Sequence, residues 1–562
     1  MTVVDNVLDW LDERLGSAGA GDEVVASTPD RPDGETDAVL LVRHAEWGAS
    51  EAGQQALEAV VGSGACRVLR RDGTRIRLRL DSALLRELAE RLEAGEPDPL
   101  RTRELAAGRS WVVNFIDPNT TKALHIGHLR NIAVGHSLGC VGEAAGIDVT
   151  RQVRLGDYGR SVGEAMAGYL AYGEGATPER SGMAGDRLVG ECYSRYVAAL
   201  GPQPEIPFED TALTREVHVA KDVADELLDR WSTGDEEAVH LFETLRRWVL
   251  DGHAATCSRL GVHVDRILFE SELLDRASAI VERGLEEGFI RRAESGAIVY
   301  DTGDPEYERF LLCRTDGFPT QHLRYIATWS STRDLYQDAH TINVLGIEWR
   351  HMVKYTAAII AELHPPGERH PDVDIVHEMV VSDTGVIKSS KGNAVLIEDI
   401  LDEIVGCEAM AQLQKRHDRV TPEEVAPLVA LARFLADPAN RRITMRPDAF
   451  VDVEAPGWVL AEAWARAWEA GSDGPPDPDL EDADYRYLVL RSAVHRRLLA
   501  NCIEREEVLP LVRFHLHLAR WYTTTTPNPR LDRAMRSVIG EGLVALGLHP
   551  TGVPRLEDLQ AA

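Results

Sequence analysis

The feature that most constrains the fold is an apolar run, WVVNFI (111–116), followed by a polar turn with a proline and a helix start at 125–140. A strand, a turn and a helix that opens on small residues form the front of a nucleotide-binding βα unit. Apolar runs return at 297–300, 341–346 and 375–381 and alternate with helical patterns. A parallel sheet interrupted by insertions requires this alternation, so we predict an α/β protein.

The chain divides into three regions of different pattern. Residues 1–108 carry an amphipathic helix, short β-like runs and a second helix, which predicts a small α/β domain. Residues 109–400 hold the predicted Rossmann-like parallel sheet, with a helical insertion near 165–265. Residues 401–562 are helical in periodicity, which predicts an all-α C-terminal domain. A chain of 562 residues is too long for one core, which agrees with this division.

The composition excludes several classes of protein. Hydrophobic residues at 44% and charged residues at 27% are ordinary for a globular protein. The 7 cysteines are scattered without a CxxC pair, which argues against a disulfide framework and a structural zinc site. No run approaches the roughly 20 apolar residues of a membrane helix, and the first residues lack a signal-peptide pattern. We expect a reduced, cytoplasmic protein with no membrane partner.

The net charge of −31 argues against a surface that binds nucleic acid everywhere. Any nucleic-acid contact therefore needs a local basic face. Residues 490–540 provide one candidate, because they hold nine arginines against four acidic residues. Such a face can meet phosphate, although charged helix surfaces are commonly just solvated.

The sharpest motif is DPNTTKALHIGHLRN (117–131), in which His125 and His128 stand where the strand gives way to the helix. A helix N-terminus offers N–H groups and a positive dipole end to phosphate, and Gly127 permits close approach of a nucleotide. Two imidazoles three residues apart share one helix face and can both donate to a phosphate. Surface histidines with satisfied hydrogen bonds, or metal ligands, are the alternative interpretations.

A second motif, VSDTGVIKSSKGNAVL (381–396), places Lys388 and Lys391 on a Gly/Ser-rich turn after a strand-like run. Lysines on such a loop can close over a triphosphate and neutralise charge on the leaving pyrophosphate. A solvated basic turn is the alternative interpretation of this segment alone.

Together the two motifs resemble the HIGH and KMSKS signatures of class I aminoacyl-tRNA synthetases. The flanking segments are similar to the arginyl branch of that family: LGDYGRSVG (155–163), LGVHVDRILFES (260–271), TDGFPTQHLRYIA (315–327) and SSKGNAVLIEDIL (389–401). The likeness spans about 110–560, and residues 1–108 match the family's N-terminal tRNA-elbow domain in size and placement. The resemblance implies ATP, Mg²⁺, a free amino acid and tRNA as cofactors and partners, and an anticodon-binding-like helical domain.

The resemblance also implies roles for the motif residues, with no metal held by protein ligands. The expected catalytic and ATP-binding residues are Lys122, His125, Gly127, His128, Lys388, Ser389 and Lys391. The second motif is partial, because Val386 and Ser389 stand where KMSKS has its lysines. Lys122 matches a lysine with which the arginyl branch compensates for a degenerate second signature, so we expect a catalytic site.

The amino acid would lie among Asn114, Asp117, Asn119, Gln321, Tyr325 and Trp349, with Asn119 at the α-amino group. In the family, Glu stands at the position of Asn114, Tyr and Asp at those of Gln321 and Tyr325, and Gln at that of Trp349. Both negative charges of the arginine pocket are therefore missing. A buried guanidinium without its carboxylate costs about 3–5 kcal/mol, whereas Trp and Tyr suit an apolar slot. We predict a neutral, aliphatic substrate rather than arginine.

Two other interpretations of the pocket stay open. A slip of one or two residues in the correspondence would let Glu348 or Asp334 supply the missing charge. Alternatively, Tyr325 and Trp349 are core residues and the pocket lies elsewhere.

The C-terminal domain also departs from the family. In GWVLAEAWAR (457–466), Ala461 and Glu462 replace the Gln and Tyr of the family's anticodon helix. An acidic side chain there would repel phosphate, which puts anticodon reading in doubt.

The sequence therefore predicts a monomeric ligase that activates a neutral amino acid with ATP to an aminoacyl-adenylate. The acceptor would be tRNA or a small-molecule amine of a specialised, antibiotic-type pathway. The alternatives are a genuine arginine–tRNA ligase and a non-catalytic paralogue that binds tRNA or an amino acid.

Overall fold

A computed structural model describes residues 7–550 of the chain with internal gaps. The gaps are 19, 21–23, 30–31, 33, 45, 48–49, 63, 202–221, 306, 365–371, 383–384, 387–394, 447 and 470–474. Among the described residues, no helix combines the length and apolar character needed to cross a membrane.

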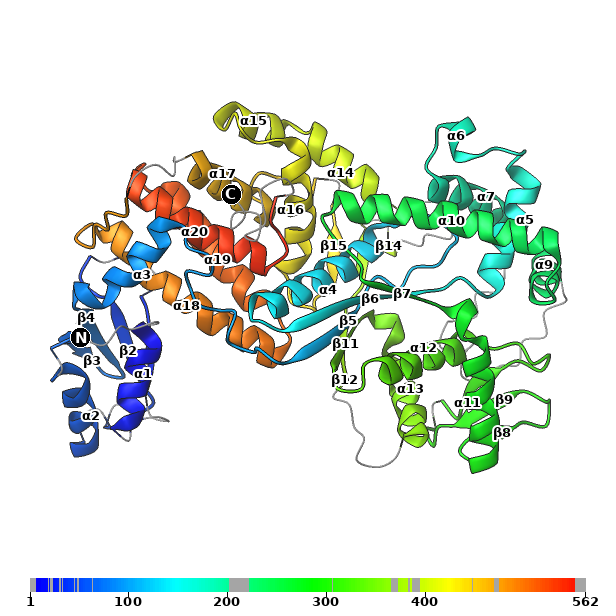
Figure 1. Ribbon diagram of the computed structural model, residues 1–562, viewed down its shortest axis with the longest axis horizontal. Coiled ribbons are helices and arrows are strands. Elements are labelled where there is room, and N and C mark those ends of the chain that lie inside the picture. Colours follow the sequence, from blue (N-terminus) through cyan, green and yellow to red (C-terminus); the bar gives the residue numbers. More distant parts are fainter. Residues whose placement is uncertain are drawn as a thin grey trace.

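A five-stranded parallel sheet forms the centre of the molecule (Figure 1), which confirms the predicted α/β class. Its strand order is β12-β11-β5-β6-β7. The strands are β5 (Ser110–Asn114), β6 (Asp148–Leu155), β7 (Arg266–Phe269), β11 (His340–Gly346) and β12 (Asp372–His377). The chain leaves β5 through α4 (Ile126–Ala144) toward β6, whereas β11 pairs with the other edge of β5. Such a reversal of strand order opens a crevice at the carboxyl ends of the strands.

Helices fill the connection between β6 and β7. They are α5 (Arg160–Tyr172), α6 (Pro178–Ser181), α7 (Gly185–Ala199), α9 (Val223–Ser232) and α10 (Glu236–Arg259). Asp157 anchors this connection to the sheet, because its buried carboxylate accepts hydrogen bonds from Ser271 and from Arg246 of α10.

A second insertion lies between β7 and β11. It contains η2 (Glu270–Leu273), α11 (Leu274–Glu287), β8 (Arg291–Arg292), β9 (Ile298–Asp301), β10 (Arg309–Cys313) and α12 (Gln321–Leu335). The apolar run 297–300 was wrongly predicted as part of the parallel sheet. It forms β9, which pairs antiparallel with β8 and β10 in a separate sheet, because short hairpin connections let these strands pair with one another.

The N-terminal residues form an antiparallel sheet of order β1-β2-β4-β3 covered by helices. The elements are α1 (Val7–Ser17), β1 (Val24–Ser27), β2 (Ala38–Val42), α2 (Glu51–Val61), β3 (Cys66–Asp72), β4 (Arg75–Leu80) and α3 (Ser82–Ala94). Asp81 caps the start of α3, and Gly95 ends it in the left-handed conformation at φ 62°.

From the connection between β11 and β12 onward, the chain is mostly helical. The elements not yet given are η3 (Ile347–Trp349), α13 (Arg350–Leu363), β13 (Val380–Ser382), β14 (Gly385–Val386), α14 (Ile397–Gly406), α15 (Glu408–Arg416), α16 (Pro422–Leu435), β15 (Ile443–Met445), α17 (Pro456–Glu469), α18 (Ala483–Arg505), α19 (Leu509–Thr524) and α20 (Pro529–Ala545). The short strand β15 departs from the predicted all-helical pattern and pairs with β13.

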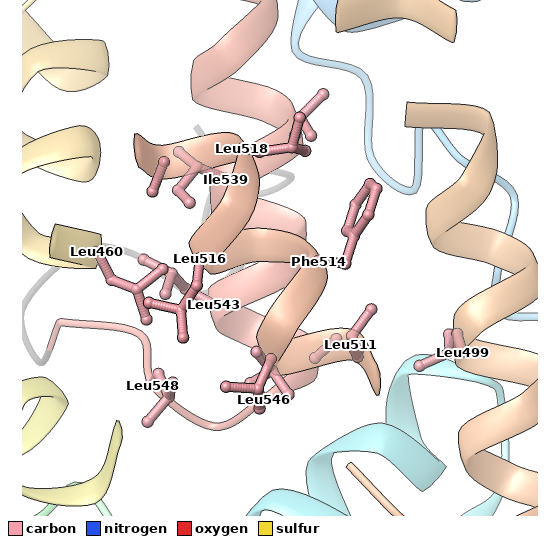
Figure 2. Packing of buried hydrophobic residues seen from close by; sticks show 14 of the residues in the cluster. Leu460, Leu499, Leu511, Phe514, Leu516, Leu518, Ile539, Leu543, Leu546 and Leu548 are labelled. Carbon is pink, nitrogen blue, oxygen red and sulfur yellow. The ribbon is translucent and has the colours of Figure 1, made fainter. Parts of the chain in front are cut away.

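Leucine side chains fill the core of the C-terminal helices (Figure 2), with Leu460 of α17, Leu518 of α19 and Leu543 of α20 all buried. Helices α16 and α20 also pack against α4. The helix that carries the first motif is therefore held between the parallel sheet and the C-terminal helices.

Candidate functional site

The loop between β5 and α4 is pinned at the carboxyl edge of the sheet. Gly156, which follows β6, donates its N–H to the carbonyl of Pro118 and accepts from the N–H of Thr120. A Cβ at position 156 would lie 2.1 Å from Oδ1 of Asn119, so a larger residue there would displace the Asn119 side chain. Ile116 and Asp117 both have positive φ, at 79° and 49°. Such backbone strain in residues other than glycine is typical of functional sites.

His125 and His128 cap the N-terminus of α4 together. Nδ1 of His125 accepts the N–H of Gly127 at 3.1 Å, and Nδ1 of His128 accepts the N–H of His125 at 3.1 Å. The ring centres are 4.0 Å apart. Because both Nδ1 atoms accept, each neutral ring carries its proton on Nε2. The capping arrangement thus leaves two neighbouring Nε2–H donors, on rings tilted by 33°.

Burial keeps both imidazoles neutral and tunes the nearby ammonium group. Burial, with smaller contributions from Lys122 and His253, lowers the pKa of His125 to about 3. It also lowers the pKa of His128 well below its usual value and that of Lys122 to about 8. Two neutral donors and an ammonium group suit a phosphate anion.

The described residues at the C-terminal end of the second motif contact the first motif. Ile126 donates its N–H to the carbonyl of Val395 at 2.9 Å, and Ile397 donates to the carbonyl of Leu124 at 3.1 Å. His125 and Leu396 form an isolated β-bridge. Lys388, Ser389 and Lys391 themselves lie outside the described residues.

Asn114 belongs to a ladder of buried amides that crosses the sheet. Its Nδ2 donates to Oδ1 of Asn343 at 2.9 Å, and its Oδ1 accepts from Gln152 at 2.7 Å. Asn343 in turn donates to Asp374, and Gln152 to Thr332. Both polar atoms of the Asn114 side chain are therefore used within the protein.

Asp117, Arg154 and Tyr325 form a buried cluster at the ends of β5 and β6 and on α12. Nε and Nη2 of Arg154 donate to the two carboxylate oxygens of Asp117 at 3.0 and 2.8 Å. Cζ of Arg154 lies 4.4 Å from the ring centre of Tyr325. Arg154 and Tyr325 are 4% and 3% exposed.

The carboxylate of Asp117, one of the predicted pocket residues, lies in this cluster, while the positions of the two missing family carboxylates stay without an acid. Burial, together with the nearby charges of Asp117 and Asp374, raises the pKa of Tyr325, while Arg154 opposes the shift. Two acids therefore lie near the phenol, and both already have partners: Asp117 binds Arg154, and Asp374 binds Asn343.

The other predicted pocket residues lie around this cluster. Trp349 stacks at 4.9 Å from Tyr325, and Gln321 is half-buried at the start of α12. Asp334 is exposed and pairs with Arg276, and Glu348 is exposed with its carboxylate folded back over Gly346. Asp334 is therefore already paired, whereas Glu348 stays a candidate for the missing charge, because its carboxylate lies beside Gly346 at the end of β11.

Sequence reasoning missed three residues that organise the site. Arg130, in the first motif, is fully buried and donates to the carbonyls of Glu378, Pro438, Ala439 and Arg441. His253 of α10 hydrogen-bonds the carbonyl of Lys122 at 2.9 Å. Arg154 is the third. Its position directly before LGDYG was the available signal, whereas His253 has no local signature.

Some of the basic residues of the C-terminal helices face the N-terminal residues. Arg497 pairs with Asp9 and Asp12, and Arg533 pairs with Glu93. These arginines hold two parts of the chain together, whereas Arg505, Arg513 and Arg520 are exposed.

Glu462, on the predicted anticodon helix, pairs with Arg416 and His417. Although burial opposes the shift, these partners lower the pKa of Glu462 to about 2. Its negative charge is therefore compensated within the protein, which weakens the expected repulsion of phosphate.

A metal site is a poor interpretation of the paired histidines. Across the part of the chain that the structure describes, no group of three or more His, Cys, Asp or Glu side chains could hold a metal ion. Both Nδ1 atoms of His125 and His128 are occupied by backbone N–H groups.

The profile of the family "tRNA synthetases class I (R), catalytic domain" matches residues 99–444. The chain is 30% identical over 335 residues to an arginine–tRNA ligase of Borrelia hermsii, covering 57% of this chain and 53% of the relative. It is 30% identical over 368 residues to one of Amoebophilus asiaticus, covering 61% and 59%. The matches thus span between half and three fifths of the length of these relatives.

Two solved structures share the fold over nearly the whole chain. Arginyl-tRNA synthetase of Thermus thermophilus matches with a TM-score of 0.66 and 19% identity, covering 98% of this chain and 100% of the other. That of Plasmodium falciparum matches with a TM-score of 0.68 and 13% identity, covering 98% and 99%. By its catalytic sequence, which extends over more than half of its length, the chain belongs to the class I arginyl-type (R) tRNA synthetase family.

Proposed function

We propose that this protein activates an amino acid with ATP and transfers it to tRNA. The observation that carries the proposal is the pair of Nε2–H donors that His125 and His128 present at the start of α4, beside Lys122. The names of the relatives, arginine–tRNA ligases, support the same reaction class.

In the proposed reaction, the amino acid carboxylate attacks the α-phosphate of ATP in line and pyrophosphate leaves. Most of the work is positioning and charge stabilisation. His125 and His128 donate to phosphate oxygens, and Gly127 leaves room for their approach. Lys122 adds a positive charge, since the pKa of about 8 that burial gives it leaves it mostly protonated at pH 7.

The second motif completes this proposal. Lys388 and Lys391, with Ser389, would contact the leaving pyrophosphate, because the residues next to them pair with the first motif. Mg²⁺ would enter with ATP, held by the phosphate oxygens, as is usual for this ion.

Arginine is the first candidate substrate, because the relatives are named for it. The replaced pocket positions favour a second candidate, a neutral amino acid. Asn114 is engaged within the sheet, and Gln321, Tyr325 and Trp349 offer no carboxylate. Asn119, beside Gly156 at the edge of the sheet, is our proposed contact for the α-amino group.

The three-domain division supports tRNA as the acceptor in this proposal: residues 1–108, 109–400 and 401–562 would contact the tRNA elbow, its acceptor end and its anticodon arm. A small-molecule amine is the alternative acceptor, which the loss of the family's Gln and Tyr at Ala461 and Glu462 favours, even though the charge of Glu462 is compensated within the protein.

ATP–pyrophosphate exchange with each of the twenty amino acids, with and without unfractionated tRNA, tests the proposal. We expect exchange with one amino acid, followed by charging of tRNA with that amino acid. Absence of exchange with every amino acid under both conditions would refute it. Exchange without tRNA charging would favour the amine acceptor.

A further inference from the structure

The site contains its own guanidinium group, Arg154, which the reaction outlined above does not use. Arg154 is the last residue but one of β6, at the carboxyl edge of the sheet, two residues before Gly156. Its partner Asp117 directly follows β5 in the loop that leads to His125. The pair therefore lies at the reversal of strand order, where ligands bind in open α/β sheets.

The surroundings of Arg154 are those that a protein uses to recognise a guanidinium ligand. A carboxylate receives two parallel N–H bonds from it, and an aromatic face lies 4.4 Å from its central carbon. Bidentate carboxylate pairing and stacking on an aromatic ring are the characteristic contacts of guanidinium recognition.

We infer that Arg154 fills the guanidinium position of this site and so selects an amino acid without a positively charged side chain. The inference rests on the proposed function, because it names the substrate class of the same site. A second guanidinium would meet a like charge, and the carboxylate of Asp117 is already bound.

The remaining polar atoms indicate which neutral side chains fit best. Nη1 of Arg154 and Oη of Tyr325 interact with each other, and neither makes a hydrogen bond of normal geometry with any described residue. Both can donate a hydrogen bond, and unpaired buried donors are costly. A neutral side chain that ends in an acceptor oxygen would satisfy them.

The test compares the wild-type protein with Arg154→Ala and with Arg151→Ala as a matched control. Arg151 is on the same strand, is 1% exposed, and binds both carboxylate oxygens of Glu143 against α4. Exchange kinetics are measured with arginine, with its neutral isostere citrulline, with glutamine and with the other amino acids. Thermal shifts are measured with methylguanidine in the same proteins.

We expect the wild-type kcat/KM for a neutral amino acid to exceed that for arginine at least tenfold. In Arg154→Ala, the freed Asp117 and Tyr325 should bind an incoming guanidinium. The kcat/KM for arginine should then rise at least tenfold, and methylguanidine should raise the melting temperature. Arg151→Ala should gain neither property.

Arginine as the best wild-type substrate, or a folded Arg154→Ala without any gain for arginine, would overturn the inference. If no amino acid supports exchange in the wild type, the proposed function fails, and the methylguanidine shift alone decides the inference. If methylguanidine stabilises only Arg154→Ala, the inference is supported. If it does not stabilise that variant, the inference is overturned. If Arg154→Ala does not fold, Arg154→Gln, which removes the charge but keeps much of the side chain, is used with the same outcomes.

Discussion

Each of the paired histidines has two separable tasks at the residue scale. Nδ1 of His128 caps the helix by accepting the N–H of His125, while Nε2 stays available as a donor. The amide groups of Asn and Gln resemble the two ring nitrogens in position: Asn can reproduce the Nδ1 acceptor, and Gln can reproduce the Nε2 donor. Substitution can therefore test one task at a time.

His128→Asn should keep the cap and lose the donor. We expect the exchange rate to fall about 100- to 1,000-fold, the loss usual for one oxyanion donor, with a change in unfolding free energy of less than about 1 kcal/mol. His128→Gln should retain more activity but lose about 1 kcal/mol of stability, because the cap is gone. Exchange assays measure the activity of the two variants, and urea unfolding measures their stability. Equal activities of the two variants would contradict the division of tasks.

Helix α4 is tied to the second motif by Arg130 at the element scale. Its buried guanidinium donates to carbonyl oxygens that directly precede two strands, at Glu378 before β13 and at 438–441 before β15. His377 of β12 adds a hydrogen bond to Asn131 of the same helix. The start of α4 and the strand that leads to Lys388 therefore keep a common position.

Arg130→Met should break this connection while it keeps the apolar stem. Hydrogen bonds to charged groups contribute about 1.5–3 kcal/mol each, so we expect unfolding free energy to fall by at least about 3 kcal/mol. The KM for ATP should also rise, because the two motifs lose their common position. Arg151→Met is the control. Arg151 is also buried, but its guanidinium donates to Glu143 and not to carbonyl groups beside the second motif. An unchanged KM in a folded Arg130→Met would exclude the coupling.

At the scale of the whole molecule, ion pairs attach the N-terminal residues to helix α18. Arg486 of α18 donates to both oxygens of Asp37, at 2.7 and 2.5 Å, and both residues are almost fully buried. Arg497 makes a more exposed pair with Asp9 in the same interface.

Arg486→Ala leaves the Asp37 carboxylate buried without its main partner, which costs about 3–5 kcal/mol. We expect a lower urea midpoint and faster proteolysis between α3 and β5. Arg497→Ala should change stability by no more than about 1 kcal/mol, because its pair is partly exposed. If the two variants behave alike, burial does not decide the strength of this attachment.

Buried histidines make the stability of the whole molecule sensitive to acid. Burial is the main cause that lowers the pKa of His136 to about 3 and those of His253 and His495 to about 4. Since the unfolded chain binds these protons near pH 6.5, stability is complete above that pH and is lost as the pH falls toward 4. His417 acts in the opposite direction, because Glu462 raises its pKa.

We therefore expect the free energy of unfolding to decrease between pH 7.5 and pH 5.5, by up to about 1.4 kcal/mol per buried histidine and pH unit. Urea unfolding in 0.3 M salt measures this while it screens the net charge of −31. His495→Asn, which still offers an acceptor to His515 but takes up no proton, should flatten the dependence. A free energy of unfolding that stays constant or rises from pH 7.5 to pH 5.5 would refute this prediction.

Local pattern was sufficient for the parts of the molecule that depend on near neighbours in the chain. The apolar run 111–116, the glycine before His128 and the helical periodicity of the C-terminal residues predicted the βα unit and the helical region. The misplacement of 297–300 has a simple cause, because a short apolar strand has the same pattern in a parallel and in an antiparallel sheet.

What the sequence alone determined was the α/β class, the strand–turn–helix with its paired histidines, and the family. These depend on periodicity and on residue spacing within one segment. Only the tertiary structure decided that Asn114 is engaged by Asn343, that Arg130 reaches 438–441, and that Asp117 is bound by Arg154. The reason is physical: whether a buried charge or amide is free to bind a ligand depends on partners that are distant in sequence, and pairing across a sheet brings those partners together.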